Sequence, residues 1–250
     1  MKAACTSLLV TLLLTACLGC LRLEEVLTIR ADGSGTLEME YVIPESTLAQ
    51  LKAMQRLRKR LATVEGDRKT VEEPDDEYTR FLLYYGSEDI EKKFKQYEKH
   101  GIRLERIKVE SRDARRHVEL KARFRNITQL QDTAMFPEHG FTLERQSDGN
   151  YFFRRRPLIG TGEPTPRPSE KEVRTLTPIL RGFYVTVQIN TPGRIIRTNA
   201  PRRSLYRAEW SFDFAQDPNA FTDFQNQEFR IAFEGRGLSL PQLKDTADNE

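Results

Sequence analysis

Strict two-residue alternation of apolar and polar side chains is the feature that most limits what this chain can fold into. Residues 36–43 read TLEMEYVI, which places Leu37, Met39, Tyr41 and Ile43 on one side and Glu38 and Glu40 on the other. This pattern is typical of a strand that buries one face of an antiparallel sheet. It recurs in HVELKARF (117–124), LYRAEWSFDF (205–214) and EFRIAF (228–233). In the third segment it predicts that Tyr206 points inward with Ala208 and Trp210.

Turn and helix signals divide the remaining sequence. Asp32-Gly33 and Asp148-Gly149 are strong turn signals, and they predict hairpins over residues 21–43 and 141–156. Apolar residues recur at helical spacing between 48 and 61, and a second helix is expected over 87–99, capped by Ser87. The sum is an α+β fold with a mostly antiparallel sheet of about ten strands and two or three helices. Whether the last strands return to the first sheet or form a second one stays open.

Composition narrows the partners and the chemistry. The 40 Lys and Arg residues nearly balance the 37 Asp and Glu residues, for a formal net charge of +3. This balance gives no global field that selects a polyanion, so no nucleic-acid partner is expected. The sequence contains no Gly-x-Ser-x-Gly elbow, Walker loop or His-Glu-x-x-His motif. We therefore expect a protein that is not an enzyme and needs no cofactor.

The N-terminus carries the clearest functional signal. Met1-Lys2 precedes an apolar run, residues 8–14, that is too short to span a bilayer and has the length of a signal-peptide core. The next residues, Leu14-Thr15-Ala16-Cys17, resemble the bacterial lipobox, in which the cysteine receives a diacylglyceryl group and the preceding peptide is removed. Cys20 is a poorer match. An ordinary signal peptide and a membrane-anchoring helix are the alternatives.

This interpretation divides the chain into three parts. Residues 1–16 are expected to be a lipoprotein signal peptide and 17–236 an extracytoplasmic domain, with a Pro/Gly-rich loop at 157–168 and a polar tail at 237–250. The membrane is then a partner through the lipid on Cys17, and several acyl chains make such anchoring stable. The expected location is the outside of the cell membrane, or the outer membrane if the host has two.

Several of these segments together resemble one known family. They are the lipobox running into LRLEEVLTIRADGSGTLEMEY, the strand HVELKARF, and GFYVTVQINTPGRIIRTNA followed by AEWSF. The chain resembles the LppM-like domain of bacterial lipoproteins over most of residues 17–235. The resemblance implies an envelope lipoprotein, and it transfers one functional residue, Cys17.

Other candidate sites have simpler explanations. His100, His117 and His139 are scattered and do not form a zinc-ligand pattern. The acidic run Asp75-Asp76-Glu77 lacks the spacing of an EF-hand and is interpreted as a solvated loop. Arg154, Arg155 and Arg156 follow two phenylalanines and suggest a grip on lipid phosphates, although the end of an alternating strand explains them as well. The basic residues 56–60 suit either an anionic membrane or the end of a helix.

The leading hypothesis is a non-enzymatic binding or interaction module at the membrane, with a lipid or another amphiphile as a candidate ligand. That version requires an apolar cavity. The alternative is a scaffold that docks another envelope protein, and an exposed apolar patch without a cavity would favour it. A hydrolase without a sequence motif is the third reading, and it would need converged carboxylates or a His–acid pair in a cleft.

Overall fold

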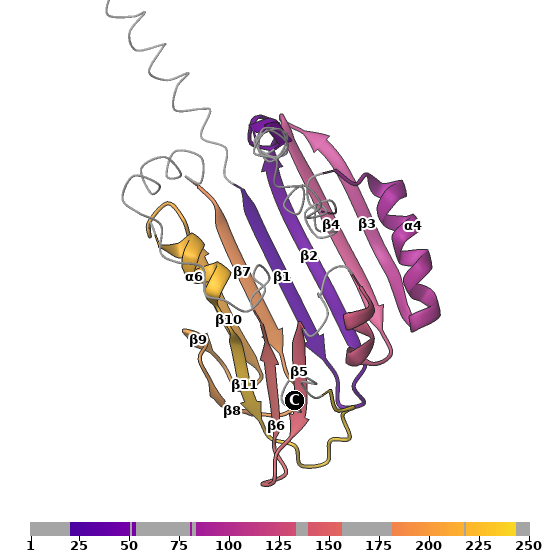
Figure 1. The fold of residues 1–250 in the computed structure, drawn as a ribbon, viewed down its shortest axis with the longest axis vertical. Helices are drawn as coiled ribbons and strands as arrows, with labels where there is room; N and C mark the ends of the chain where they lie inside the picture. Colours follow the sequence, from indigo (N-terminus) through magenta and orange to yellow (C-terminus); the bar gives the residue numbers. More distant parts are fainter. Residues whose placement is uncertain are drawn as a thin grey trace, which may run out of the picture.

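The computed structural model describes residues 21–50, 52–53, 81, 84–133, 140–156, 182–217 and 219–243. In these ranges the chain forms two β-sheets, with strands that are mostly antiparallel (Figure 1). The α+β class expected from the alternation is therefore confirmed. The seven-stranded sheet has the order β3-β4-β2-β1-β7-β10-β9 and the four-stranded sheet the order β5-β6-β11-β8.

The alternating segments 36–43, 117–124, 205–214 and 228–233 each form a strand, with bounds that differ from the predicted ones by at most two residues. The large sheet contains β1 (Arg22–Ile29), β2 (Gly35–Pro44), β3 (Ile102–Arg112), β4 (Arg115–Phe124), β7 (Tyr184–Asn190), β9 (Arg202–Arg203) and β10 (Arg207–Asp213). The small sheet contains β5 (Phe141–Arg145), β6 (Tyr151–Arg155), β8 (Ile195–Thr198) and β11 (Phe229–Phe233).

The first hairpin forms as its turn signal predicts. Asp32 accepts hydrogen bonds from the backbone N–H and the hydroxyl of Ser34, at 3.0 and 2.7 Å. Gly33 has a φ of +81°, which glycine adopts without steric cost. At the start of β2, a Cβ on Gly35 would lie 1.9 Å from the carbonyl oxygen of Thr28. The close approach of the two strands therefore requires glycine at this position.

The pairing left open by the sequence is resolved by one parallel contact. β7 lies beside β1 in parallel, with Arg22 opposite Tyr184 and Thr28 opposite Asn190. β10 then adds to β7, whereas β8 and β11 join the small sheet. Both of the arrangements that the sequence left open therefore occur. Some of the last strands complete the first sheet, and the others belong to a second sheet.

The two sheets enclose a common core. Figure 1 shows the small sheet lying over the lower part of the large one. Trp210 of β10 packs edge-on against Phe229 of β11, with ring centroids 4.9 Å apart. Glu25 of β1 and Arg155 of β6 form a two-contact ion pair across the layers, and their side chains are only 3% and 1% exposed. This pair is a buried polar link between the two sheets.

Short helices cover the remaining edges. α4 (Ser87–Tyr97) packs against β3 through its buried residues Ile90 and Phe94, and it continues into η1 (Glu98–His100). The predicted cap at Ser87 is wrong by one residue, because Gly86 is the N-cap and its N–H is bound by Asp89 at 2.9 Å. Residues 45–50 and 52–53 are also helical. The other elements are η2 (Ile127–Asp132) and α6 (Ala220–Asn226), which lies beside β10.

One predicted core residue is not in the core. Ala208, Trp210 and Phe212 point inward from β10 as expected, but Tyr206 is 52% exposed. Tyr206 precedes the first residue of β10, so the alternation of that strand does not extend to it. Its exposure marks the segment that leads into β10 as part of the surface.

Candidate functional site

Residues 194–207, here called the arm, are the most unusual part of the described surface. The arm contains β8, β9 and the segments that lead from β7 and into β10. Backbone hydrogen bonds hold it in shape. The N–H of Ile195 donates to the carbonyl oxygen of Leu205 at 2.7 Å, and the N–H of Thr191 donates to the carbonyl oxygen of Tyr206 at 2.9 Å. β9 pairs with β10 at two positions. The arm is therefore an ordered element, not a loose loop.

Large apolar side chains project from the arm into solvent. Ile196, Leu205 and Tyr206 are 48%, 60% and 52% exposed. In the part of the chain that the structure describes, the other large exposed hydrophobic residue is Tyr84. Single exposed apolar residues are ordinary, but a group of them is a mark of an interaction surface.

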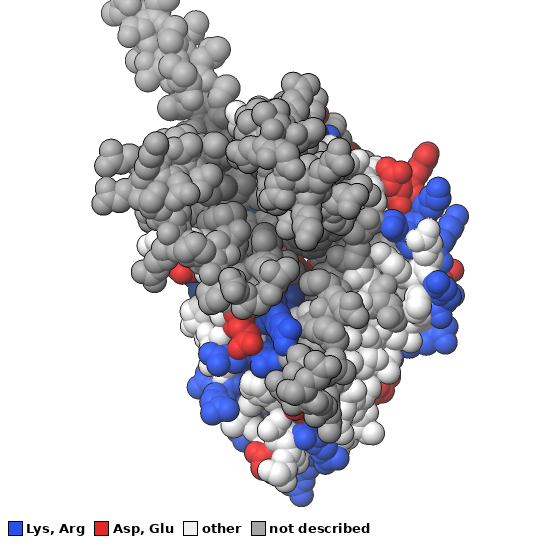
Figure 2. Space-filling model, viewed as in Figure 1, with Lys and Arg blue, Asp and Glu red and all other residues white. Residues whose placement is uncertain are grey.

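Arginines surround these apolar side chains. Arg194 binds Glu234 at 2.6 Å, and this hydrogen bond raises the pKa of its guanidinium. Arg202 lies 3.4 Å from Glu209. By contrast, Arg197, Arg203 and Arg207 make no ion pair with any described residue. In Figure 2, Lys and Arg side chains gather at the lower left, where Figure 1 places β8 and β9.

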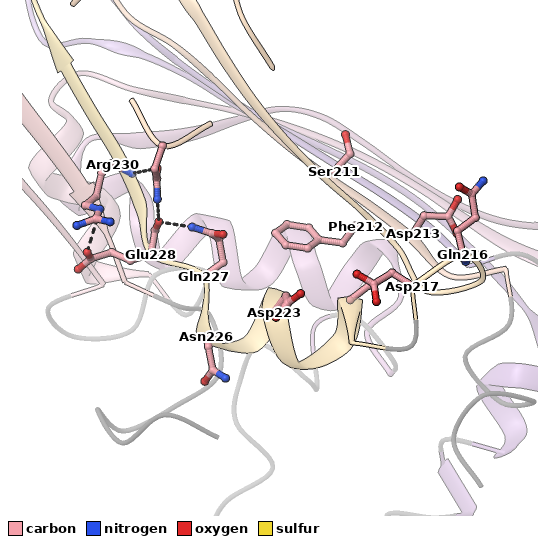
Figure 3. Close-up of a pocket in the computed structure, with 12 residues that line it drawn as sticks. Ser211, Phe212, Asp213, Gln216, Asp217, Asp223, Asn226, Gln227, Glu228 and Arg230 are labelled. Atoms are coloured by element: carbon pink, nitrogen blue, oxygen red, sulfur yellow. Dashed lines mark hydrogen bonds and ion pairs between the residues drawn. The ribbon is translucent and has the colours of Figure 1, made fainter. Parts of the chain in front are cut away.

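An acidic groove lies next to the arm (Figure 3). It has a volume of about 640 Å³, and it is bounded by the end of β10, by α6 and by the start of β11. α6 is held in place by Phe224, whose ring lies 5.2 Å from that of Phe212. The charged groups that line the groove are Asp213, Asp217, Asp223, Glu228 and Arg230. The charged lining of the groove therefore consists of four carboxylates and one guanidinium.

Most of these carboxylates are positioned by the fold. Asp213 accepts hydrogen bonds from the N–H groups of Ala215 and Gln216, at 2.9 and 3.2 Å. Asp217 accepts one from the N–H of Asn219 at 2.8 Å. Glu228 lies 3.5 Å from Arg230 and 3.6 Å from Arg154. Asp223, in the first turn of α6, is exposed and has no ion-pair partner among the described residues.

Asn199 joins the arm to the groove. Its side chain accepts a hydrogen bond from the N–H of Arg230 at 2.9 Å and donates one to the carbonyl of Glu228 at 2.7 Å. Asn199 follows β8 in the chain and also lines the groove. A basic, partly apolar surface and an acidic hollow are therefore fixed side by side.

A hydrolase would need converged carboxylates, whereas the carboxylates of this groove are spread along it, from Glu228 at one end to Asp213 and Asp217 at the other (Figure 3). The described residues that line it include no histidine. The hydroxyl of Ser211 is buried in the wall and has no hydrogen-bond partner among the described residues. A nucleophilic hydroxyl requires an adjacent base. The carboxylates of Asp213 and Asp217 are already engaged by backbone N–H groups.

The structure places Arg154 and Arg155, two of the three arginines that the sequence suggested as ligands of lipid phosphates, on opposite faces of β6. Along β6, Phe153 and Arg155 point inward, whereas Phe152 and Arg154 point outward. Arg155 is buried in the ion pair with Glu25. The alternative explanation, the end of an alternating strand, is confirmed.

The described histidines lie far from each other in the sheet. His100 precedes the start of β3, and His117 lies opposite Glu110 near its other end. The Nε2 atom of His117 is buried without a hydrogen-bond partner in the described ranges. No group of three or more His, Cys, Asp or Glu residues suited to a metal ion occurs in those ranges.

The remaining sequence-based candidates lie outside the described residues. They are Cys17, Cys20, His139, the acidic run 75–77, the basic run 56–60 and the loop 157–168. Within the described part, no helix is both long enough and apolar enough to cross a membrane.

Sequence reasoning missed the arm as a site. The alternation assigned residues 205–207 to a strand, and no pattern indicated a site in residues 194–204. Its signal is nevertheless present, because RIIRTNAPRRSLYR holds five arginines and four large apolar residues in one short segment.

Comparisons with known proteins add little. No protein-family model matches the chain, and no curated protein matches it either. Among solved structures, it is similar to the NMR structure of the folded domain of the Mycobacterium tuberculosis LppM protein. The two are 12% identical, the match covers 88% of this chain and 95% of that one, and the TM-score is 0.38. This is a loose structural likeness, and it supports no inference about function.

Proposed function

We propose that this chain is a non-enzymatic interaction module of the bacterial envelope. In this proposal a lipid on Cys17 tethers it to a membrane, and the arm docks another envelope protein. The observation that carries the docking role is the exposure of Ile196, Leu205 and Tyr206. They lie in a segment with five arginines, only two of which make an ion pair with a described residue. Tyr and Arg are enriched at the energetic centres of protein interfaces.

The shape and lining of the surface favour docking over carriage of an amphiphile. An acyl chain needs an apolar cavity. The groove beside the arm is lined by carboxylates and amides, and other grooves bounded by described residues carry charged side chains as well. A lipid that co-purifies at about one molecule per chain, detected by mass spectrometry, would instead support a carrier.

The position of the arm favours a partner in the aqueous compartment. β1 begins at Arg22, close in sequence to Cys17, and β7 runs parallel to β1. The arm follows the far end of β7, so it lies at the end of the sheet opposite the start of β1. Eight residues of strand span roughly 23 Å, well beyond a Debye length of about 8 Å. With the domain upright on its tether, the surface charge of that membrane would be screened at the arm.

Photo-crosslinking in cells tests this function. Leu205 is replaced by p-benzoylphenylalanine in the full chain, and the matched control carries the same group at Tyr84, which is also exposed. We expect a discrete protein adduct from position 205 and none from position 84. The adduct should disappear when Arg197 and Arg203 are both changed to Glu. No protein adduct, or one indifferent to the arginines, would overturn the proposal.

A further inference from the structure

A second hollow, here called the recess, lies on the outer face of the small sheet, next to the arm. Its volume is about 470 Å³. Its floor is a row of residues that lie opposite one another on three strands: Phe152 of β6, Ala232 of β11 and Arg197 of β8. Phe152 and Ala232 are half-buried. Because the side chain of Ala232 is a single methyl group, the row is lowest at its centre.

A β-bulge gives the recess an apolar wall and a cation. The register of β8 against β11 shifts between Ala232 and Phe233, so that Ile196 is an extra residue in β8. Neighbouring residues of a regular strand point to opposite faces, but Ile196 and Arg197 both line the recess. Bulges re-aim side chains in this way beside functional sites. Ile196 is 48% exposed, and Arg197 makes no ion pair with a described residue.

The opposite wall is the turn between β5 and β6, and its carboxylate is already engaged. Asp148 accepts hydrogen bonds from the backbone N–H and the side-chain amide of Asn150, at 3.0 and 2.9 Å. Gln146 and Ser147 add uncharged polar groups to this wall. Of the two charged side chains among the described lining residues, Arg197 is therefore the one left to bind a ligand. A guanidinium binds carboxylates strongly, often through two hydrogen bonds.

Resting on the proposed docking function, we infer that the recess selects the partner. It takes one large apolar side chain of another envelope protein, and Arg197 binds a carboxylate next to that side chain. The apolar group lies over Ala232, between Phe152 and Ile196. An anchor side chain in a pocket, with an arginine beside it, is typical of the energetic centre of an interface.

The place of the recess agrees with the docking surface. Ile196 and Arg197 belong to both the recess and the arm, so one partner covers the two together. In Figure 1 the turn between β5 and β6 lies at the bottom of the view, whereas β1 begins in its upper part. On an upright domain the recess therefore opens toward the aqueous compartment, as the arm does.

The acidic C-terminal tail of the chain has only half of the required chemistry. Leu243 pairs with Leu143 on β5, and residues 244–250 follow it. They read KDTADNE, which offers carboxylates but no large apolar side chain. A partner that presents both groups is therefore the better match for the recess.

Photo-crosslinking from inside the recess identifies the occupant. In the full chain, p-benzoylphenylalanine replaces Phe152, which is itself aromatic and lines the recess. The adduct formed in cells is digested and sequenced by mass spectrometry. We expect attachment to another protein, at or beside a large apolar residue that has Asp or Glu as a sequence neighbour.

Two substitutions test the two parts of the recess separately. Ala232→Leu fills the depression and Arg197→Gln removes the cation. Each should lower the yield of the protein adduct from position 205 about tenfold. Ala215→Leu and Arg30→Gln make the same changes at exposed residues outside the recess and should leave the yield unchanged.

A charge exchange completes the test. Replacing the partner's carboxylate by Arg should restore the adduct of Arg197→Glu to within about twofold of the parent. Because Arg197 is exposed, its variants keep the test decisive even if Ala232→Leu unfolds the domain.

The remaining outcomes separate this inference from the docking function. A protein adduct from position 205 that is indifferent to both Ala232→Leu and Arg197→Gln would overturn the recess and leave docking standing. So would an adduct from position 152 to a lipid or to this same chain, within one molecule or between two. No protein adduct from either position would overturn both.

Discussion

The buried ion pair between Glu25 and Arg155 gives the sharpest prediction about stability. The pair joins the two sheets, and both side chains are almost fully buried. The guanidinium also lies 5.7 Å from the centre of the Phe229 ring. Removing one partner leaves a buried charge without its counter-ion, which typically costs about 3–5 kcal/mol. Glu25→Leu and Arg155→Met should each show this loss.

The expected loss is large compared with the whole stability of a domain. Domains are stable by about 5–15 kcal/mol, so either single change should lower the melting temperature by roughly 10 °C. The double variant should recover most of the loss, because an apolar pair of similar volume avoids desolvation of the two charges. The two effects should therefore be strongly non-additive.

Urea unfolding of the four proteins measures this coupling. Trp210 is the only tryptophan in the chain and packs against Phe229, so its fluorescence reports on the layer that contains the ion pair. Single variants that each cost less than about 1 kcal/mol, or a double variant that costs the sum of the two, would refute the reasoning.

Two other predictions concern the backbone and pH. Gly35→Ala should cost about 1–3 kcal/mol because its Cβ meets the Thr28 carbonyl. Gly86→Ala, whose Cβ would meet no atom closer than 3.7 Å, should cost less in thermal unfolding, about 0.5–1 kcal/mol for a poorer N-cap. Burial raises the pKa of the Tyr41 hydroxyl, although Arg116 opposes this. The stabilisation is therefore present below the unfolded pKa of about 10 and is lost as pH rises through the folded value. Tyr41→Phe should lose less unfolding free energy between about pH 9 and pH 11 than the parent; an equal loss would contradict this assignment.

Local structure could be predicted from the sequence because it depends on neighbouring residues. Asp32-Gly33 and Asp148-Gly149 mark hairpins whose strands are adjacent in the chain, and alternation identifies their buried faces. The parallel pair of β1 and β7 joins segments on either side of residues 157–168. The register of this parallel pair depends on packing between segments that are far apart in the chain, and no local sequence pattern encodes it.

The ion pair between the sheets and the candidate functional surface could be predicted only in part, for a similar reason. The alternation places Glu25 and Arg155 on inward faces, but the ion pair exists only because two sheets meet there. The arm was not predicted as a candidate site, because the alternation predicted that Tyr206 is buried. The groove combines residues from β10, α6 and β11, so its acidity emerges only when these elements come together.

The proposed function depends most on the tether, because the proposal uses the tether to place the arm at the outer end of an envelope protein. Mass spectrometry of the N-terminal peptide from the membrane fraction tests it directly. We expect a mature chain that begins at Cys17 and carries diacylglyceryl on that sulfur, and we expect Cys17→Ala to accumulate as an unlipidated precursor. A soluble native chain that retains residues 1–16, or an unmodified Cys17 in the membrane fraction, would contradict the account.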